Sequence, residues 1–269
     1  MKPTMRKAGI ILILAGAALF VAACNGGGAP PEEQSPTTAP SPEATPTTSP
    51  PTPSTGDACS HAATAGEETN LIPNPSFEDG VDPWFALKPP DFTLSEEVVH
   101  SGTASAHLEL RNPAEAEGTD IRYLVQELTL AEVPEVISGY YRVENWNKNT
   151  PKQYIQFVVI AFGAGNMPGN FPNHQIRYIL SGLSEPPFEI ANAFFQFLGP
   201  EEPVSGEWIR FEANLREDFQ QLWGAVPQGF ECLRFLFEVR YDNKVAGDGP
   251  AEADVYYDDL YLGPAPAPE

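Results

Sequence analysis

The side chains that could do chemistry in this sequence are its histidines, its thiols and its many carboxylates. The histidines show no metal-binding spacing such as H-E-x-x-H, and the chain has neither a G-x-S-x-G nucleophile motif nor a glycine-rich phosphate loop after an expected strand. Among 37 Asp and Glu residues, no pair stands out as the acid and base of a glycosidase, a mechanism that the sequence leaves open. We therefore predict that the chain is not an enzyme. The histidines are His61, His100, His107 and His174.

The first thiol, Cys24, follows a segment with the order of a secretory signal. Basic residues open the chain, and an apolar run follows from Ala8 to Ala23. That run of roughly 16 residues is shorter than the ~20 that a membrane-spanning helix needs. The ending Val21-Ala22-Ala23-Cys24 resembles the lipobox of bacterial lipoproteins. The resemblance implies that residues 1–23 are a signal peptide, that the Cys24 thiol is acylated, and that the chain is extracytoplasmic, anchored to the cell membrane or outer membrane. A secretory signal without lipidation, or a retained helix, is the alternative.

The other two thiols are Cys59 and Cys232. With Cys24 assigned to lipid, they remain as a pair in an oxidising compartment, and we predict a disulfide between them. The alternative is two unrelated thiols, because a disulfide needs a specific geometry that spacing does not show.

Charge limits the partners. The formal net charge is −22, and removal of the three positive charges in residues 1–23 gives −22 − 3, or about −25. Such a chain repels nucleic acid and anionic lipid head groups, so we expect no nucleic-acid partner and membrane contact only through the lipid anchor. We expect a monomer.

Residues 24–65 are expected to form a linker between the lipidated Cys24 and a folded domain. Positions 29–56 are almost entirely Pro, Ser, Thr, Ala and Glu, without apolar periodicity, which is typical of disorder. About 28 residues in an extended polyproline form, at ~3.1 Å each, would reach some 85 Å. The sequence therefore predicts a long tether.

Residues 66–263 are expected to form one all-β domain, followed by a disordered tail at 264–269. Aromatic and β-branched runs alternate with Pro, Gly, Asn and Asp, and helical periodicity is confined to Leu215–Leu222. Many short strands at near-regular spacing favour a β-sandwich or jelly roll. The expected strands are Phe92–Val99, Ser105–Leu110, Ile121–Leu130, Val136–Val143, Gln153–Phe162, Gln175–Leu180, Ala193–Leu198, Trp208–Asn214, Leu233–Tyr241 and Ala253–Leu262.

Several motifs in this domain occur in a characteristic order: Asn70-Leu71-Ile72-Pro73-Asn74-Pro75-Ser76-Phe77-Glu78-Asp79-Gly80 with Trp84, His100-Ser101-Gly102-Thr103-Ala104-Ser105, Gln126, Gly206-Glu207-Trp208, and Val255-Tyr256-Tyr257-Asp258-Asp259-Leu260-Tyr261-Leu262. In this order the chain resembles the carbohydrate-binding modules of the family 4, 9 and 22 type. The resemblance implies a galactose-binding-domain-like jelly-roll β-sandwich that binds a polysaccharide or oligosaccharide. Residues 163–204 depart from the family pattern and predict an enlarged loop or extra hairpin at one rim.

The resemblance also implies a structural Ca²⁺ ion. The residues matching its ligands are Glu78 and Asp258, with Asp259 as the alternate and a backbone carbonyl near Gly102. Two carboxylates brought together from opposite ends of the chain would repel without a cation, and Ca²⁺ prefers such oxygen ligands. Strand alternation is expected to let only one of Asp258 and Asp259 face the site. The alternative is solvated surface carboxylates.

Strand alternation suggests a ligand-binding face. Leu233, Phe235, Phe237 and Val239 should pack inward, which turns Arg234, Glu238 and Arg240 outward. The same argument gives the expected ligand contacts Tyr140, Arg142, Gln156 and Arg240, because a sugar favours aromatic rings and planar hydrogen-bonding groups. The alternative is an ordinary solvated face of a sandwich.

The tryptophans divide by their surroundings. Trp146 and Trp223 lie in polar stretches, so we add them as candidate contacts, with packing under the 163–204 insertion as the alternative. The resemblance to the carbohydrate-binding modules implies that Trp84 and Trp208 lie in the core.

These observations lead to one hypothesis and one alternative. The hypothesis is a surface-tethered, non-catalytic carbohydrate-binding lipoprotein, whose binding weakens when Tyr140 or Arg142 is substituted. The alternative is a protein-interaction or envelope-structural β-sandwich that binds no sugar. An open groove lined by the expected contacts favours sugar, and a groove filled by residues 163–204 favours the alternative.

Overall fold

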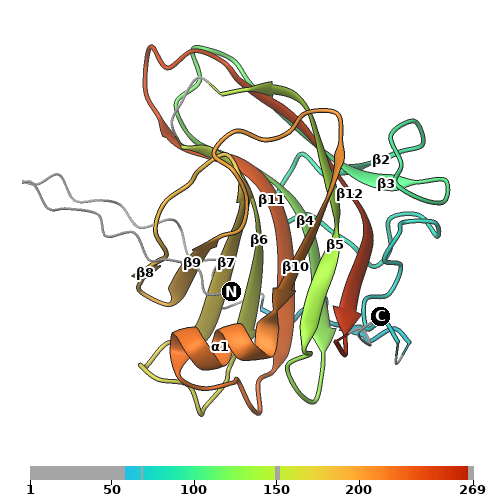
Figure 1. The fold of residues 1–269 in the computed structure, drawn as a ribbon, viewed down its shortest axis with the longest axis vertical. Helices are drawn as coiled ribbons and strands as arrows, with labels where there is room; N and C mark the ends of the chain where they lie inside the picture. Colours follow the sequence, from blue (N-terminus) through green and yellow to red (C-terminus); the bar gives the residue numbers. More distant parts are fainter. Residues whose placement is uncertain (1–57, 68, 149–151, 266–269) are drawn as a thin grey trace, which may run out of the picture. The chain divides into compact units, whose positions relative to one another are not determined.

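The computed structural model describes residues 58–67, 69–148 and 152–265, which form two β-sheets packed face to face (Figure 1). Among these residues the larger sheet has seven strands in the order β1-β4-β11-β6-β7-β9-β8, and the smaller has five in the order β10-β5-β12-β3-β2. The chain crosses between the sheets at most connections, and the fold is a jelly-roll β-sandwich. The expected signal peptide, Cys24 and most of the expected linker lie outside the described residues.

The strands have the following bounds. The seven-stranded sheet contains β1 (Ala63–Thr64), β4 (Gly118–Thr129), β6 (Gln153–Phe162), β7 (Asn173–Ser181), β8 (Phe188–Ile190), β9 (Ala193–Phe197) and β11 (Cys232–Lys244). The five-stranded sheet contains β2 (Thr93–Ser95), β3 (Ser105–Asn112), β5 (Val136–Asn147), β10 (Trp208–Asn214) and β12 (Ala251–Gly263).

The core lies between the sheets and is built from alternate residues of each strand. Phe235 and Phe237 of β11 and Phe157 of β6 are almost fully buried, and from the opposite sheet Tyr257 and Phe211 meet the ring of Phe237 at centroid distances of 5.1 and 6.1 Å. Offset and tilted aromatic pairs of this kind stabilise a core beyond the area that they bury. The predicted inward set on β11 is therefore confirmed.

One helix, α1 (Leu215–Trp223), follows β10 directly. The Asn214 side chain accepts a hydrogen bond from the backbone N–H of Glu217, and Gly224 ends the helix with φ 74°. Leu215, Phe219 and Trp223 recur every four residues and form its buried face. No helix in the described ranges is long and apolar enough to cross a membrane.

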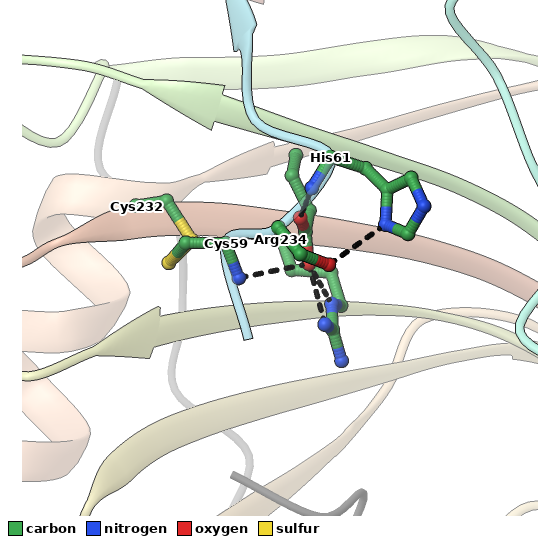
Figure 2. Close-up of a disulfide and its surroundings, with 6 residues drawn as sticks. Cys59, His61, Cys232 and Arg234 are labelled. Atoms are coloured by element: carbon green, nitrogen blue, oxygen red, sulfur yellow. Dashed lines mark hydrogen bonds and ion pairs between the residues drawn. A yellow bond between two sulfur atoms is a disulfide. The ribbon is translucent and has the colours of Figure 1, made fainter. Parts of the chain in front are cut away.

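The predicted disulfide between Cys59 and Cys232 is present, with Cα atoms 5.8 Å apart (Figure 2). It joins the segment before β1 to the first residue of β11. Directly after this segment, β1 pairs in parallel with β4. Next to it the buried carboxylate of Glu127 accepts the backbone N–H groups of Cys59 and His61 at 3.3 and 2.9 Å, and it pairs with the buried Arg234. Residues 58–64 are therefore held against the outer face of the larger sheet, and we call this segment the N-terminal strap.

The expected departure at residues 163–204 forms part of the larger sheet. It contributes β7 next to β6, then the antiparallel hairpin of β8 and β9, with β9 parallel to β7. The extra hairpin predicted for this stretch therefore extends one side of the sheet.

Candidate functional site

The four strand residues predicted to contact ligand lie on two different faces of the sandwich. Tyr140 and Arg142 belong to β5 of the five-stranded sheet, whereas Gln156 and Arg240 belong to β6 and β11 of the seven-stranded sheet. Their strand neighbours Tyr141, Ile155 and Val239 pack in the core, so all four point outward, away from each other's sheet. The single groove predicted for them is wrong. Alternation separates inside from outside but does not say to which sheet a strand belongs.

The tryptophan predictions also need correction. Trp223 is buried under the 163–204 insertion, where its ring contacts His174 and Phe194 at centroid distances of 4.8 and 4.7 Å. Trp146, at the end of β5, packs against the same core. Neither lies on the outer face that carries Gln156 and Arg240. Trp84 is in the core as predicted, but Trp208 lies partly exposed on the outer face of the smaller sheet.

A polar row crosses the middle of the larger sheet's outer face. Gln156 and Glu238 are register partners on β6 and β11, and the Gln156 amide donates a hydrogen bond to the Glu238 carboxylate. Arg240 donates to Glu238 at 3.3 Å and to Asp242 at 3.0 Å. The Gln156 side-chain carbonyl oxygen is buried and accepts no hydrogen bond from any residue that the structure describes.

The electrostatics of this row are set by burial and by its own charges. Burial on its own lowers the pKa of the Arg240 guanidinium, but Tyr154, Glu238 and Asp242 raise it overall. Burial has the opposite effect on the acidic phenol of Tyr154 and raises its pKa. The Tyr154 hydroxyl donates to Asp242 at 2.8 Å. The row therefore presents neutral phenol together with charged guanidinium and carboxylate groups.

Two partly exposed side chains flank the row. Tyr123 lies on β4 opposite Glu238, and burial raises its pKa to about 12. Arg177 lies on β7, where its guanidinium donates two hydrogen bonds to the side-chain oxygen Oε1 of Gln175 at 2.8 and 3.1 Å. It stands 5.6 Å from the Phe195 ring centroid. Among the described residues no carboxylate forms an ion pair with Arg177. We call Tyr123, Gln156, Arg177, Glu238 and Arg240 the polar face.

The polar face has apolar borders on both sides. On the β4 side, Phe85 pairs with Val125 through the backbone and stacks on His61 of the N-terminal strap at 4.5 Å. On the β7 side, Phe188 and Phe195 of the β8–β9 hairpin stack at 4.6 Å. The first border comes from the N-terminal strap and the segment before β2, and the second comes from the hairpin at the edge of the sheet.

Sequence reasoning did not nominate Tyr123 or Arg177 and placed Glu238 only as outward-facing. The signal was available, because Tyr123 directly precedes the inward Leu124 and Arg177 lies between the inward Ile176 and Tyr178. They lie beside the polar row only because β4 and β7 flank β11 and β6. Pairing between strands that are distant in sequence cannot be read from the local pattern of residues.

The outer face of the five-stranded sheet is a different surface. The Tyr140 ring is stacked on His100 at a centroid distance of 3.7 Å, and Trp208 meets the same imidazole edge-on at 5.5 Å. Arg142 pairs with its strand neighbour Glu144. One face of Tyr140 is thus already occupied by protein, which disfavours it as a stacking platform for a sugar.

The carboxylates predicted to bind calcium converge on the loop at residues 100–104. Glu78 accepts hydrogen bonds from the backbone and hydroxyl of Thr103 at 2.8 and 2.6 Å, and Asp258 accepts from the backbone N–H of His100 at 2.8 Å. Asp259 is 2.6 Å from the His100 imidazole. A β-bulge between Asp258 and Tyr261 and a φ of 48° at Asp259 turn both neighbours toward the loop, so the expectation that only one could face it is wrong.

These oxygens have the chemistry that Ca²⁺ prefers, but as placed they accept N–H and O–H groups. No cluster of three or more His, Cys, Asp or Glu side chains in the described residues is arranged to hold a metal. Calcium binding therefore stays a prediction. The dependence of the unfolding temperature on added calcium or chelator is its test.

The sequence matches no family model and no curated protein. The solved structures to which the chain is similar include carbohydrate-binding modules. TmCBM61, in complex with β-1,4-galactotriose, shares 14% identity over 72% of this chain and 97% of its own, with a TM-score of 0.40. The CBM22-2 xylan-binding domain of Paenibacillus barcinonensis Xyn10C shares 14% identity over 70% of this chain and 96% of its own, with a TM-score of 0.39. At these scores the likenesses decide neither a family nor a ligand for this chain.

Proposed function

We propose that this protein is a non-catalytic carbohydrate-binding lipoprotein whose polar face binds a polysaccharide or oligosaccharide. The observation that carries the proposal is the Gln156–Glu238–Arg240 row, which lies between Tyr123 and Arg177 on adjacent strands of one sheet. Sugar hydroxyls both donate and accept hydrogen bonds, so they pair with mixed amide, carboxylate and guanidinium groups. The C–H face of a sugar ring packs on an aromatic ring such as Tyr123.

The members of the polar face have different roles in this proposal. Tyr123 and Arg177 are partly exposed and would contact the sugar first, whereas Gln156, Glu238 and Arg240 are buried and fix the geometry beneath them. The Arg177 guanidinium is already oriented by Gln175, which reduces the entropy lost on binding.

A matched pair of arginine variants tests which face binds. Arg177→Gln changes the polar face, and Arg142→Gln makes the same change on the opposite sheet, at a residue that is also partly exposed. In affinity electrophoresis against a panel of neutral and acidic polysaccharides, we expect Arg177→Gln to weaken binding roughly tenfold, about 1.4 kcal/mol, and Arg142→Gln to leave it unchanged.

Two results would overturn the proposal. If Arg142→Gln weakens binding and Arg177→Gln does not, the binding face is the five-stranded sheet. If the folded wild-type protein is retained by none of the polysaccharides, sugar binding is rejected and the protein-interaction or envelope-structural module remains. Release of reducing ends from a bound polysaccharide would instead contradict the non-catalytic part.

A further inference from the structure

Lys244, the last residue of β11, is buried and has no carboxylate partner in the described part of the chain. Its side chain is 2% exposed, and its Nζ atom donates hydrogen bonds to the Asn112 side-chain carbonyl at 2.8 Å and to the backbone carbonyl of Pro113. The Tyr241 ring centroid lies 5.9 Å away. Among the described residues no Asp or Glu is within ion-pair distance of this amine. Lysine is almost never fully buried unless it is paired, so this position calls for an explanation.

Asn112, the last residue of β3, is also buried, with 8% of its surface exposed. Its amide nitrogen donates to a carboxylate oxygen of Asp120 on β4 at 3.3 Å. An amine, a carboxamide and a carboxylate therefore follow one another across three strands that are distant in sequence. Arg122 pairs with the other oxygen of Asp120 and keeps this carboxylate in place.

We propose that Lys244 and Asn112 become joined by an intramolecular isopeptide bond. The Lys244 nitrogen attacks the Asn112 side-chain carbonyl carbon, a C–N amide bond forms, and the bond from that carbon to the Asn112 amide nitrogen breaks. The lysine enters as an ammonium ion and the nitrogen of Asn112 leaves as an ammonium ion, so atoms and charge balance. No oxidant, reductant or co-reactant is needed.

Asp120 has a defined part in this reaction. The Lys244 Nζ atom donates to the Asn112 side-chain oxygen, so the protons that the amine gives up pass to that oxygen. The Asp120 carboxylate accepts a hydrogen bond from the nitrogen that must leave and is placed to relay a proton to it. The backbone carbonyl of Pro113 accepts a second hydrogen bond from the Lys244 amine. Burial of both partners holds them together and excludes water, which raises the effective concentration of the amine at the carbonyl.

With this bond, both ends of β11 would be covalently linked to other segments of the chain. The first residue of this strand, Cys232, is bonded to the N-terminal strap, and the last, Lys244, would be bonded to β3 of the other sheet. Both covalent links then tie segments far apart in sequence to the same strand of the larger sheet.

Mass spectrometry of the purified full chain tests the proposal directly. After reduction of the disulfide and proteolysis, we expect a branched peptide that joins residues 112 and 244 and is lighter than the two separate peptides by one ammonia. Asn112→Asp should give the same branched peptide with loss of one water instead, because aspartate loses a hydroxyl. Asp120→Asn should slow or abolish formation while both reacting residues remain.

Lys244→Met removes the amine and must give only unlinked peptides of full mass. Recovery of the 112 and 244 peptides unlinked from the wild-type chain would overturn the proposal and leave Lys244 as a hydrogen-bonded anchor. Because that measurement uses the unaltered protein, it decides the question even if a variant fails to fold.

Discussion

At the scale of single residues, the loop at 100–104 shows how carboxylates can hold backbone in place. Glu78, Asp258 and Asp259 come from the two ends of the domain and accept hydrogen bonds from this loop. A carboxylate that accepts backbone N–H groups is stabilised in its charged form. The loop and the last strand are therefore coupled through charge as well as packing.

Gly102 is needed at the centre of this loop. It has φ 66°, and a Cβ atom added there would come within 2.2 Å of a Glu78 carboxylate oxygen. Gly80 has φ 89° but open space around the added atom, so Gly80→Ala measures backbone strain alone. We expect Gly80→Ala to cost about 1 kcal/mol and Gly102→Ala to cost more, because Glu78 must also move off Thr103. Urea unfolding measures both, and equal losses would show that Glu78 is unimportant.

The same loop predicts acid sensitivity. Hydrogen bonds from Thr103 lower the pKa of Glu78 from 4.5. Desolvation raises the pKa of Asp259, but hydrogen bonds from His100, Ser101 and Ser76 outweigh it and lower the pKa overall. A carboxyl group with a lowered folded-state pKa stabilises the fold above its unfolded pKa and loses this contribution as pH falls.

We therefore expect the unfolding temperature to fall as pH drops below about 4.5, and Thr103→Val to flatten the upper part of that dependence. Asp258 opposes the effect, since burial raises its pKa. Scanning calorimetry from pH 7 to pH 3 provides the measurement. An unchanged profile in Thr103→Val would remove Glu78 from the explanation.

The sequence predicted which strand residues point outward, but it did not predict which of them lie on the same sheet. Gln156 and Arg240 do share a face, since both stand outside the core on neighbouring strands. Tyr140 and Arg142 show the same alternation in their strand as Gln156 and Arg240, but they lie on the five-stranded sheet. Nothing local distinguishes these cases, because sheet membership is decided by pairing between distant strands.

At the scale of elements, the expected strands and the expected helix were largely correct, and β6 and β10 match to the residue. Alternating hydrophobic patterns and intervening turns mark these segments strongly. β1 and β8 were missed, since they have two and three residues and exist only through their partners β4 and β9. A segment that short carries no periodicity of its own.

The disulfide is the element-scale feature with the largest expected effect. Cys59 and Cys232 are 173 positions apart, so their bond restricts the unfolded chain strongly. We expect the Cys59→Ser, Cys232→Ser double variant to lose about 2–5 kcal/mol of unfolding free energy, with guanidinium unfolding as the measurement. Reductant should lower the stability of the wild type and leave the double variant unchanged. Equal stability of the two oxidised proteins would show that Glu127 and the strap suffice without the bond.

At the scale of the whole molecule, the proposal places one sandwich at the end of a lipid-anchored tether. It rests on the resemblance of residues 21–24 to a lipobox and on the Pro-rich composition that follows. Cys24→Ser removes the acylated thiol and leaves the rest of the chain unchanged. We expect the wild type in the membrane fraction, extractable by detergent, and the variant in the soluble extracytoplasmic fraction. Recovery of the variant in the membrane fraction would favour a retained helix.

The attachment of the N-terminal strap also determines how the domain responds to being pulled. Tension applied through the chain before Ala58 reaches Cys59 before it reaches β1, and it passes through the sulfur bridge into Cys232. β11 lies between β4 and β6 and is paired with both along most of its length. The mechanical load therefore enters an interior strand of the larger sheet, where it is shared by two rows of hydrogen bonds. A pull of this kind cannot unzip the domain from the two-residue strand at its edge.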